Sequence, residues 1–139
     1  MAELRNSGIA GARVAADPLI GAAAAYLAAN LLHTADHLRQ GLGDVSTAVL
    51  VGGTALTIGA VLVLWLSLRG DSRTPVAAMW VGGAAAVGAV ASHLLPSWGT
   101  LSYSYPDKGV DALSWIVVLL EISAAAYLAV VGFRARRDA

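Results

Sequence analysis

The sequence predicts an all-α integral membrane protein whose four transmembrane helices form an up-down bundle. Of its 139 residues, 58% are hydrophobic and only 13% are charged, whereas about 25% of the residues in a soluble globular domain are charged. The mean hydropathy is +0.69, and the chain contains four long apolar runs. At this length we expect a single domain that covers residues 1–139.

Each apolar run is long enough for one membrane helix, which needs about 20 mainly apolar residues. The predicted helices are residues 18–38, 45–68, 75–95 and 110–133. Asp17 and Pro18 are typical of a helix start, as the N-cap and the first helical residue. The residues before Asp17 carry charges without an apolar core, which predicts a short cytoplasmic lead-in and not a signal peptide.

The distribution of basic residues predicts the orientation of the bundle. With the N-terminus in the cytoplasm, only Arg39 and Lys108 lie outside. The basic residues that then lie inside are Arg5, Arg13, Arg69, Arg73, Arg134, Arg136 and Arg137. This split of seven against two predicts that both termini are cytoplasmic, in a multi-pass protein of the plasma (inner) membrane.

The three connections between the predicted helices differ in length. Residues 41–44 and 70–74 form short turns, which make successive helices antiparallel neighbours. Residues 96–109 form a longer segment with three aromatic residues, two prolines and two glycines. Because long loops in compact domains are often functional, we expect this segment to form an ordered cap over the outer face.

Polar side chains gather at the end of the first apolar run. Asn30, His33 and His37 follow one another at spacings of three and four residues, which places them on one face of a helix. Asp36 lies at the edge of that face. With a rise of about 1.5 Å per residue, His33 lies roughly 22 Å from the inner end of its helix. A polar stripe on a membrane helix is expected to face the bundle and to be functional.

Two more polar residues approach this stripe from other helices. His93 lies roughly 25 Å from the inner side in the third run, about level with His33. Glu121 lies in the middle of the fourth run, where a carboxylate costs about 2.5–3.5 kcal/mol to insert. We therefore expect Glu121 to be protonated, paired or bound to a cation. A lone histidine in a helix is more often a hydrogen-bonded core residue than a ligand. The functional prediction therefore depends on the polar stripe, His93 and Glu121 taken together.

This group predicts a histidine/carboxylate metal site in the outer half of the bundle, on the extracytoplasmic side. Two histidines four residues apart can ligate one ion from a single helix. The predicted ligands are His33, His37, His93, Asp36 and Glu121, with Asp36 either as a ligand or as an acceptor for a ring N–H. Nitrogen and oxygen ligands without thiolate suit Zn, Cu or non-haem Fe, in a redox or metal-handling role.

Three other functions are compatible with these residues. One is a b-type haem protein with His93 and either His33 or His37 as axial ligands. Another is a proton-coupled small transporter that uses Glu121. In span count the chain resembles the small multidrug resistance transporters, although in that family the membrane glutamate lies on the first helix. The last is an accessory subunit of a larger membrane complex.

Composition also bounds the chemistry and the partners. The absence of cysteine excludes disulfides, thiolate catalysis and iron–sulfur clusters. A net charge of zero gives no reason to expect nucleic acid as a partner. The predicted partner is the lipid bilayer, and the many small residues in the first three helices also favour close helix packing or a homo-oligomer.

Overall fold

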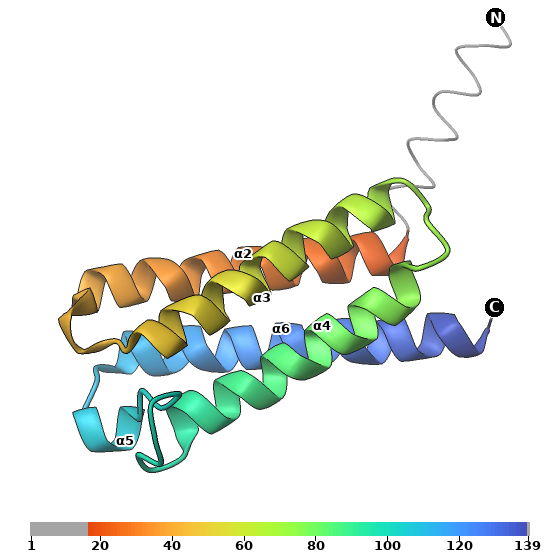
Figure 1. Ribbon diagram of the computed structural model, residues 1–139. Helices are drawn as coiled ribbons and strands as arrows, with labels where there is room; N and C mark the ends of the chain where they lie inside the picture. Colours follow the sequence, from red (N-terminus) through yellow and green to blue (C-terminus); the bar gives the residue numbers. More distant parts are fainter. Residues whose placement is uncertain (1–16, 139) are drawn as a thin grey trace, which may run out of the picture.

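The computed structural model describes residues 17–138, and this part of the chain is largely helical (Figure 1). As predicted, four helices in this range are long and apolar enough to cross a membrane. They are α2 (Pro18–Gln40), α3 (Thr47–Leu68), α4 (Thr74–Ala89) continued by the π-helical segment η2 (Val90–Leu94), and α6 (Ala112–Arg137). The lead-in predicted before Asp17 lies outside the described residues.

The helix ends differ from the predicted ones by a few residues, for local reasons. α2 continues two residues further and stops at Gly41, whose φ of +93° is costly for a residue with a Cβ. α3 begins at Thr47, because the Ser46 side chain accepts a hydrogen bond from a backbone N–H in the first turn. α6 continues one turn further, to Arg137, where basic residues favour a helix C-terminus.

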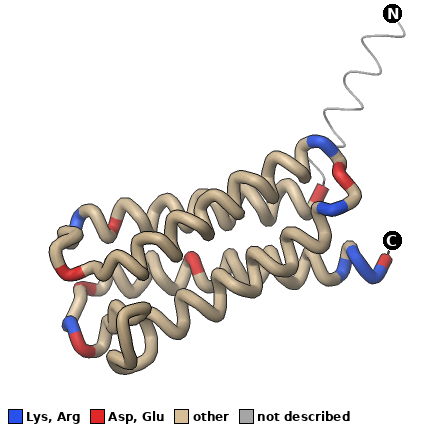
Figure 2. The backbone as a smooth tube through the Cα atoms, viewed as in Figure 1, with Lys and Arg blue, Asp and Glu red and all other residues tan. Residues whose placement is uncertain are grey.

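The helices run up and down as an antiparallel bundle (Figure 1). The α3–α4 turn, the start of α2 and the end of α6 lie at one end, which we call the inner end. The outer end holds the turn with η1 (Leu42–Asp44) and the segment with the short helix α5 (Tyr105–Lys108). Figure 2 shows that the charged residues of the described chain lie mainly at these two ends.

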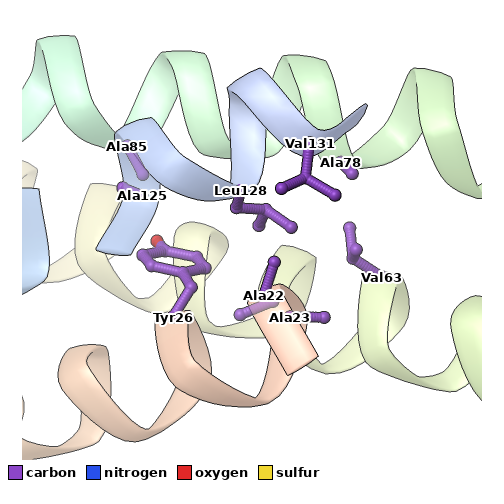
Figure 3. Close-up of a cluster of buried hydrophobic side chains, with 10 residues drawn as sticks. Ala22, Ala23, Tyr26, Val63, Ala78, Ala85, Ala125, Leu128 and Val131 are labelled. Carbon is purple, nitrogen blue, oxygen red and sulfur yellow. The ribbon is translucent and has the colours of Figure 1, made fainter. Parts of the chain in front are cut away.

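The main apolar core fills the inner half of the bundle (Figure 3). All four long helices contribute to it, mostly with small side chains that let the backbones approach one another. Its buried members are Ala22, Ala23, Tyr26, Ala60, Val63, Ala78, Ala85, Ala125, Leu128 and Val131. A second, smaller cluster at the outer end consists of Val45, Tyr103, Tyr105 and Val118. Asn30 and His33 follow Tyr26 of the main core along α2, toward the outer end.

α4 and α6 are in close backbone contact at two glycines. A Cβ on Gly82 would lie 2.6 Å from both the Ala125 carbonyl oxygen and the Ala129 nitrogen. A Cβ on Gly132 would lie 2.7 Å from the carbonyl oxygen of Pro75. Real Cβ atoms do not approach backbone so closely, so this helix pair requires glycine at both positions.

We therefore expect Gly82→Ala to push α4 away from α6 and to lower the free energy of unfolding by about 1–3 kcal/mol, as is typical of overpacking. The apparent Tm of the detergent-purified protein measures this loss. Gly83→Ala is the matched control, because a Cβ on Gly83 meets no atom within 4 Å. Equal Tm values for the two variants would contradict the close contact.

Candidate metal centre

Three histidines from two helical segments meet in the outer half of the bundle. His33 and His37 of α2 and His93 of η2 each offer a nitrogen within 4.8 Å of the others. The ring centres lie 4.6 Å apart for His33 and His37, 4.7 Å for His33 and His93, and 5.3 Å for His37 and His93. His33 and His93 are both 5% exposed, whereas His37 is partly exposed. We call these three residues the histidine cluster.

The local backbone explains why the three rings converge. His33 and His37 are one turn apart on α2 and share its inward face. His93 lies in the π-helical segment η2, a local widening of the helix that is frequent at functional sites. The segment ends because Leu95 is extended, as is usual for a residue before proline, here Pro96. The sequence signalled the histidine spacing but not the π-helical geometry.

Glu121 of α6 lies next to the histidine cluster. Its Oε2 lies 2.8 Å from Nδ1 of His33. Its Oε1 accepts a hydrogen bond of 2.8 Å from the Asn30 amide, whose oxygen in turn accepts one of 2.6 Å from Thr57. Side chains from α3, α2 and α6 thereby hold one edge of the His33 ring in place.

The remaining ring nitrogens have a distinct pattern of partners. Nε2 of His33 lies 2.8 Å from Nε2 of His37. Nδ1 of His93 lies 3.2 Å from the backbone oxygen of Tyr103. A ring that donates from Nδ1 keeps Nε2 unprotonated, which is the form that binds a metal. Nδ1 of His37 is buried and has no hydrogen-bond partner among the described residues.

Asp36 is the predicted ligand that the structure does not bring into the histidine cluster. Its two carboxylate oxygens accept hydrogen bonds from Nε of Arg39 at 2.8 Å and from the Gln40 amide at 2.6 Å. Arg39 also binds both oxygens of Asp111, at 2.8 and 3.0 Å. These contacts fasten the outer end of α2 to the start of α6, where Asp111 also caps the helix by accepting from the Ser114 backbone N–H.

The Arg39–Asp111 pair changes the pKa of the Asp111 carboxyl group. Hydrogen bonds from the Arg39 guanidinium, together with the one from the Ser114 backbone, lower the pKa of Asp111 to about 2. A bidentate arginine–carboxylate contact is among the strongest charge-assisted hydrogen bonds. Asp111 therefore stays ionised at all but strongly acidic pH, and its role is to join two helices as well as to start one.

Two tyrosines from the segment 96–109 cover the outer side of the histidine cluster. Tyr103 and Tyr105 are 4% and 1% exposed. The Tyr105 ring centre lies 4.9 Å from that of His93, and the Tyr103 ring centre lies 5.0 Å from that of His37. Burial raises the pKa of Tyr105 well above its usual range. The sequence predicted that this aromatic segment caps the outer face, but it did not indicate that these two tyrosines contact the histidines.

A cavity of about 380 Å³ adjoins the histidine cluster on the side of α3 and α4. All three histidines line it, together with Asn30 and Glu121. The other lining residues are mostly apolar and come from α2, the turn with η1, α3, α4, η2 and the first part of the segment 96–109. The candidate centre thus has one polar wall and a larger apolar one.

Comparison with known proteins gives no match: no family model fits the chain, and no curated protein and no solved structure is significantly similar to it. The function is therefore inferred from the residues and their geometry.

Proposed function

We propose that this chain is an integral membrane protein that binds one transition-metal ion through His33, His37 and His93. The spacing of the imidazole rings carries the proposal. An ion about 2.1 Å from a ligating nitrogen lies roughly 3.2 Å from the ring centre, so ligands at 90–110° have ring centres roughly 4.5–5.3 Å apart. The three separations of 4.6, 4.7 and 5.3 Å lie in this range.

The hydrogen-bond partners of the ring nitrogens that would not bind the ion support the same proposal. A metal-binding histidine almost always donates its other ring N–H to a carboxylate or a backbone carbonyl, which fixes its tautomer. His33 has the Glu121 carboxylate at Nδ1, and His93 has the Tyr103 carbonyl there. In this proposal Glu121 orients a ligand and does not bind the ion, and Asp36 supports α2 through Arg39.

The donor set limits the choice of metal. Imidazole ligands without a thiolate suit Zn²⁺, Cu²⁺ or non-haem iron. Three protein ligands leave a coordination position for water or a substrate, as in catalytic zinc sites. This open position favours a reactive or exchanging ion in a redox or metal-handling role over a closed structural site.

The same geometry favours a single ion over a b-type haem. Axial histidines on opposite faces of a haem have ring centres roughly 6.4 Å apart. His93 is closer than this to both other rings, at 4.7 and 5.3 Å. Proton-coupled transport by Glu121 has less support, because Asn30 and His33 engage its two oxygens.

We propose that the inner end of the bundle faces the cytoplasm and that the metal lies on the extracytoplasmic side of the inner membrane. Arg69 and Arg73 in the α3–α4 turn lie at the same end as the basic C-terminus of α6 (Figure 2). At the outer end, Lys108 pairs with Asp44, and Arg39 pairs with two aspartates. Cytoplasmic segments carry an excess of Lys and Arg, and the described inner end holds five arginines against two basic residues at the outer end.

Elemental analysis of the detergent-purified protein tests the proposal. We expect about one equivalent of a transition metal per chain, retained through gel filtration and restored by Zn²⁺, Cu²⁺ or Fe²⁺ after chelation. An absorption spectrum of the same sample distinguishes this outcome from bound haem. Failure to retain any of the three ions would overturn the metal proposal, and a haem spectrum would replace it.

A further inference from the structure

The histidine cluster is covered toward the outer end and open toward the side of the bundle. Tyr103 and Tyr105 are buried against the His37 and His93 rings and close the outer face. The cavity of about 380 Å³ lies on the side of α3 and α4. The cavity also extends to exposed apolar residues near the outer end, among them Leu42, Trp98 and Leu101. A molecule that reaches the cluster through the cavity therefore passes mainly apolar side chains.

The wall that α3 and α4 give to this cavity is mostly apolar and rich in small residues. Gly52 and Gly53 of α3 and Gly88 and Ala89 of α4 line it, and a Cβ on any of these three glycines meets no atom within 4 Å. Leu50 of α3 also lines the cavity, and its side chain is 41% exposed on the side of the bundle. In a bilayer this surface faces hydrocarbon, so the cavity is accessible to molecules dissolved in the membrane.

The polar wall of the cavity offers one site for an oxygen donor. On the metal proposal, three histidines leave one coordination position open. Three neutral ligands and the single neighbouring carboxylate of Glu121 leave one charge of a divalent ion uncompensated in a medium of low dielectric constant, which favours an anionic fourth ligand. Nδ1 of His37 is a further buried polar atom at this cluster, and residues 17–138 supply no hydrogen-bond partner for it.

We propose that the cavity binds a membrane-dissolved molecule with an apolar body and a single acidic oxygen group. This inference rests on the proposed metal centre, because the oxygen completes the coordination of the ion. A volume of about 380 Å³ is in the range of small-molecule sites, roughly 300–1,000 Å³. Long-chain carboxylic acids and alkylphenols share this chemistry, and both partition into bilayers.

Binding of labelled palmitic acid and labelled 4-nonylphenol to the metal-loaded protein in phosphatidylcholine nanodiscs tests the proposal and separates the two sources. We expect saturable binding of at least one probe and no competition from hexadecane, which has the apolar body without the oxygen. Chelation of the metal should weaken this binding by about tenfold or more, because the oxygen loses its cation.

Two leucine substitutions on α4 test the location. Gly88→Leu places a side chain in the cavity and should weaken probe binding by about tenfold or more. Gly83→Leu is the control on the same helix, because Gly83 has open space around its Cβ position but does not line the cavity. We expect both variants to keep one metal ion per chain.

The possible results separate this inference from the proposed function. Competition by hexadecane equal to that of palmitic acid would overturn the requirement for an oxygen donor. Equal probe binding by wild type and Gly88→Leu, or no binding of either probe to protein that retains one metal ion, would overturn the cavity as the site. Absence of metal in the wild type would overturn the proposed function itself.

Discussion

Replacement of His93 by asparagine is expected to abolish stoichiometric metal binding and to leave the bundle folded. The amide nitrogen of asparagine occupies the place of Nδ1 and can still donate to the Tyr103 carbonyl, whereas nothing replaces Nε2. We expect the metal affinity to fall by more than about 100-fold. Loss of a residue that only hydrogen-bonds to a ligand typically costs about 10–100-fold, and loss of the ligand itself should cost more. The fold should persist, because the main apolar core lies in the inner half and does not include His93.

Metal competition with a chelator measures the affinity of this variant, and apparent Tm with circular dichroism measures its fold. His93→Ala should lose both the metal and the hydrogen bond to Tyr103, so its apparent Tm should lie below that of His93→Asn. Ser92→Ala is the control, because it changes the neighbouring residue of η2 without removing a ring nitrogen. Wild-type affinity in His93→Asn would show that His93 is not a ligand.

The four helices could be predicted from sequence because each is a long apolar run bounded by residues that start or stop a helix. Asp17 accepts a hydrogen bond from the Leu19 backbone N–H and caps α2 as predicted. Local geometry escaped prediction. The π-helical turn that carries His93 has no sequence signature, and α6 continues past its apolar run because its basic residues are good helix formers at a favourable end.

The histidine cluster could be anticipated because helical phase and depth together place a side chain on a helix. The partners of the carboxylates could not, since Asp36 and Glu121 both lie on or beside inward faces. Asp36 accepts a hydrogen bond from Arg39 on its own helix. Arg39 also binds Asp111, which is 72 positions further along the chain. Only the rotation of one helix against another decides which polar atoms meet. The burial of aromatic residues in the segment 96–109 follows from a loop conformation that no periodicity encodes.

Replacement of Glu121 by glutamine is expected to weaken metal binding by about 10–100-fold. The glutamine oxygen can still accept from the Asn30 amide, so its amide group faces Nδ1 of His33. Two N–H groups cannot share a hydrogen bond, and the ring then favours the tautomer with its proton on Nε2. That nitrogen is the one that faces His37, so the proton occupies a ligand position that the metal requires.

The spectrum of the Cu²⁺- or Co²⁺-loaded protein distinguishes this positioning role from a general loss of packing. Glu121→Gln should shift the ligand-field bands at saturating metal, because the His33 ring is no longer held by a carboxylate. Thr57→Val is the matched control, since it keeps the side-chain shape and leaves the Asn30–Glu121 hydrogen bond in place. It removes the Thr57 hydroxyl, which lies near the Asn30 oxygen and the Gly53 carbonyl. We expect Thr57→Val to lose less affinity and to keep the wild-type spectrum. If Glu121→Gln also kept the wild-type metal affinity and the wild-type spectrum, the buried carboxylate would serve the packing of α6 against α2 and not the metal centre.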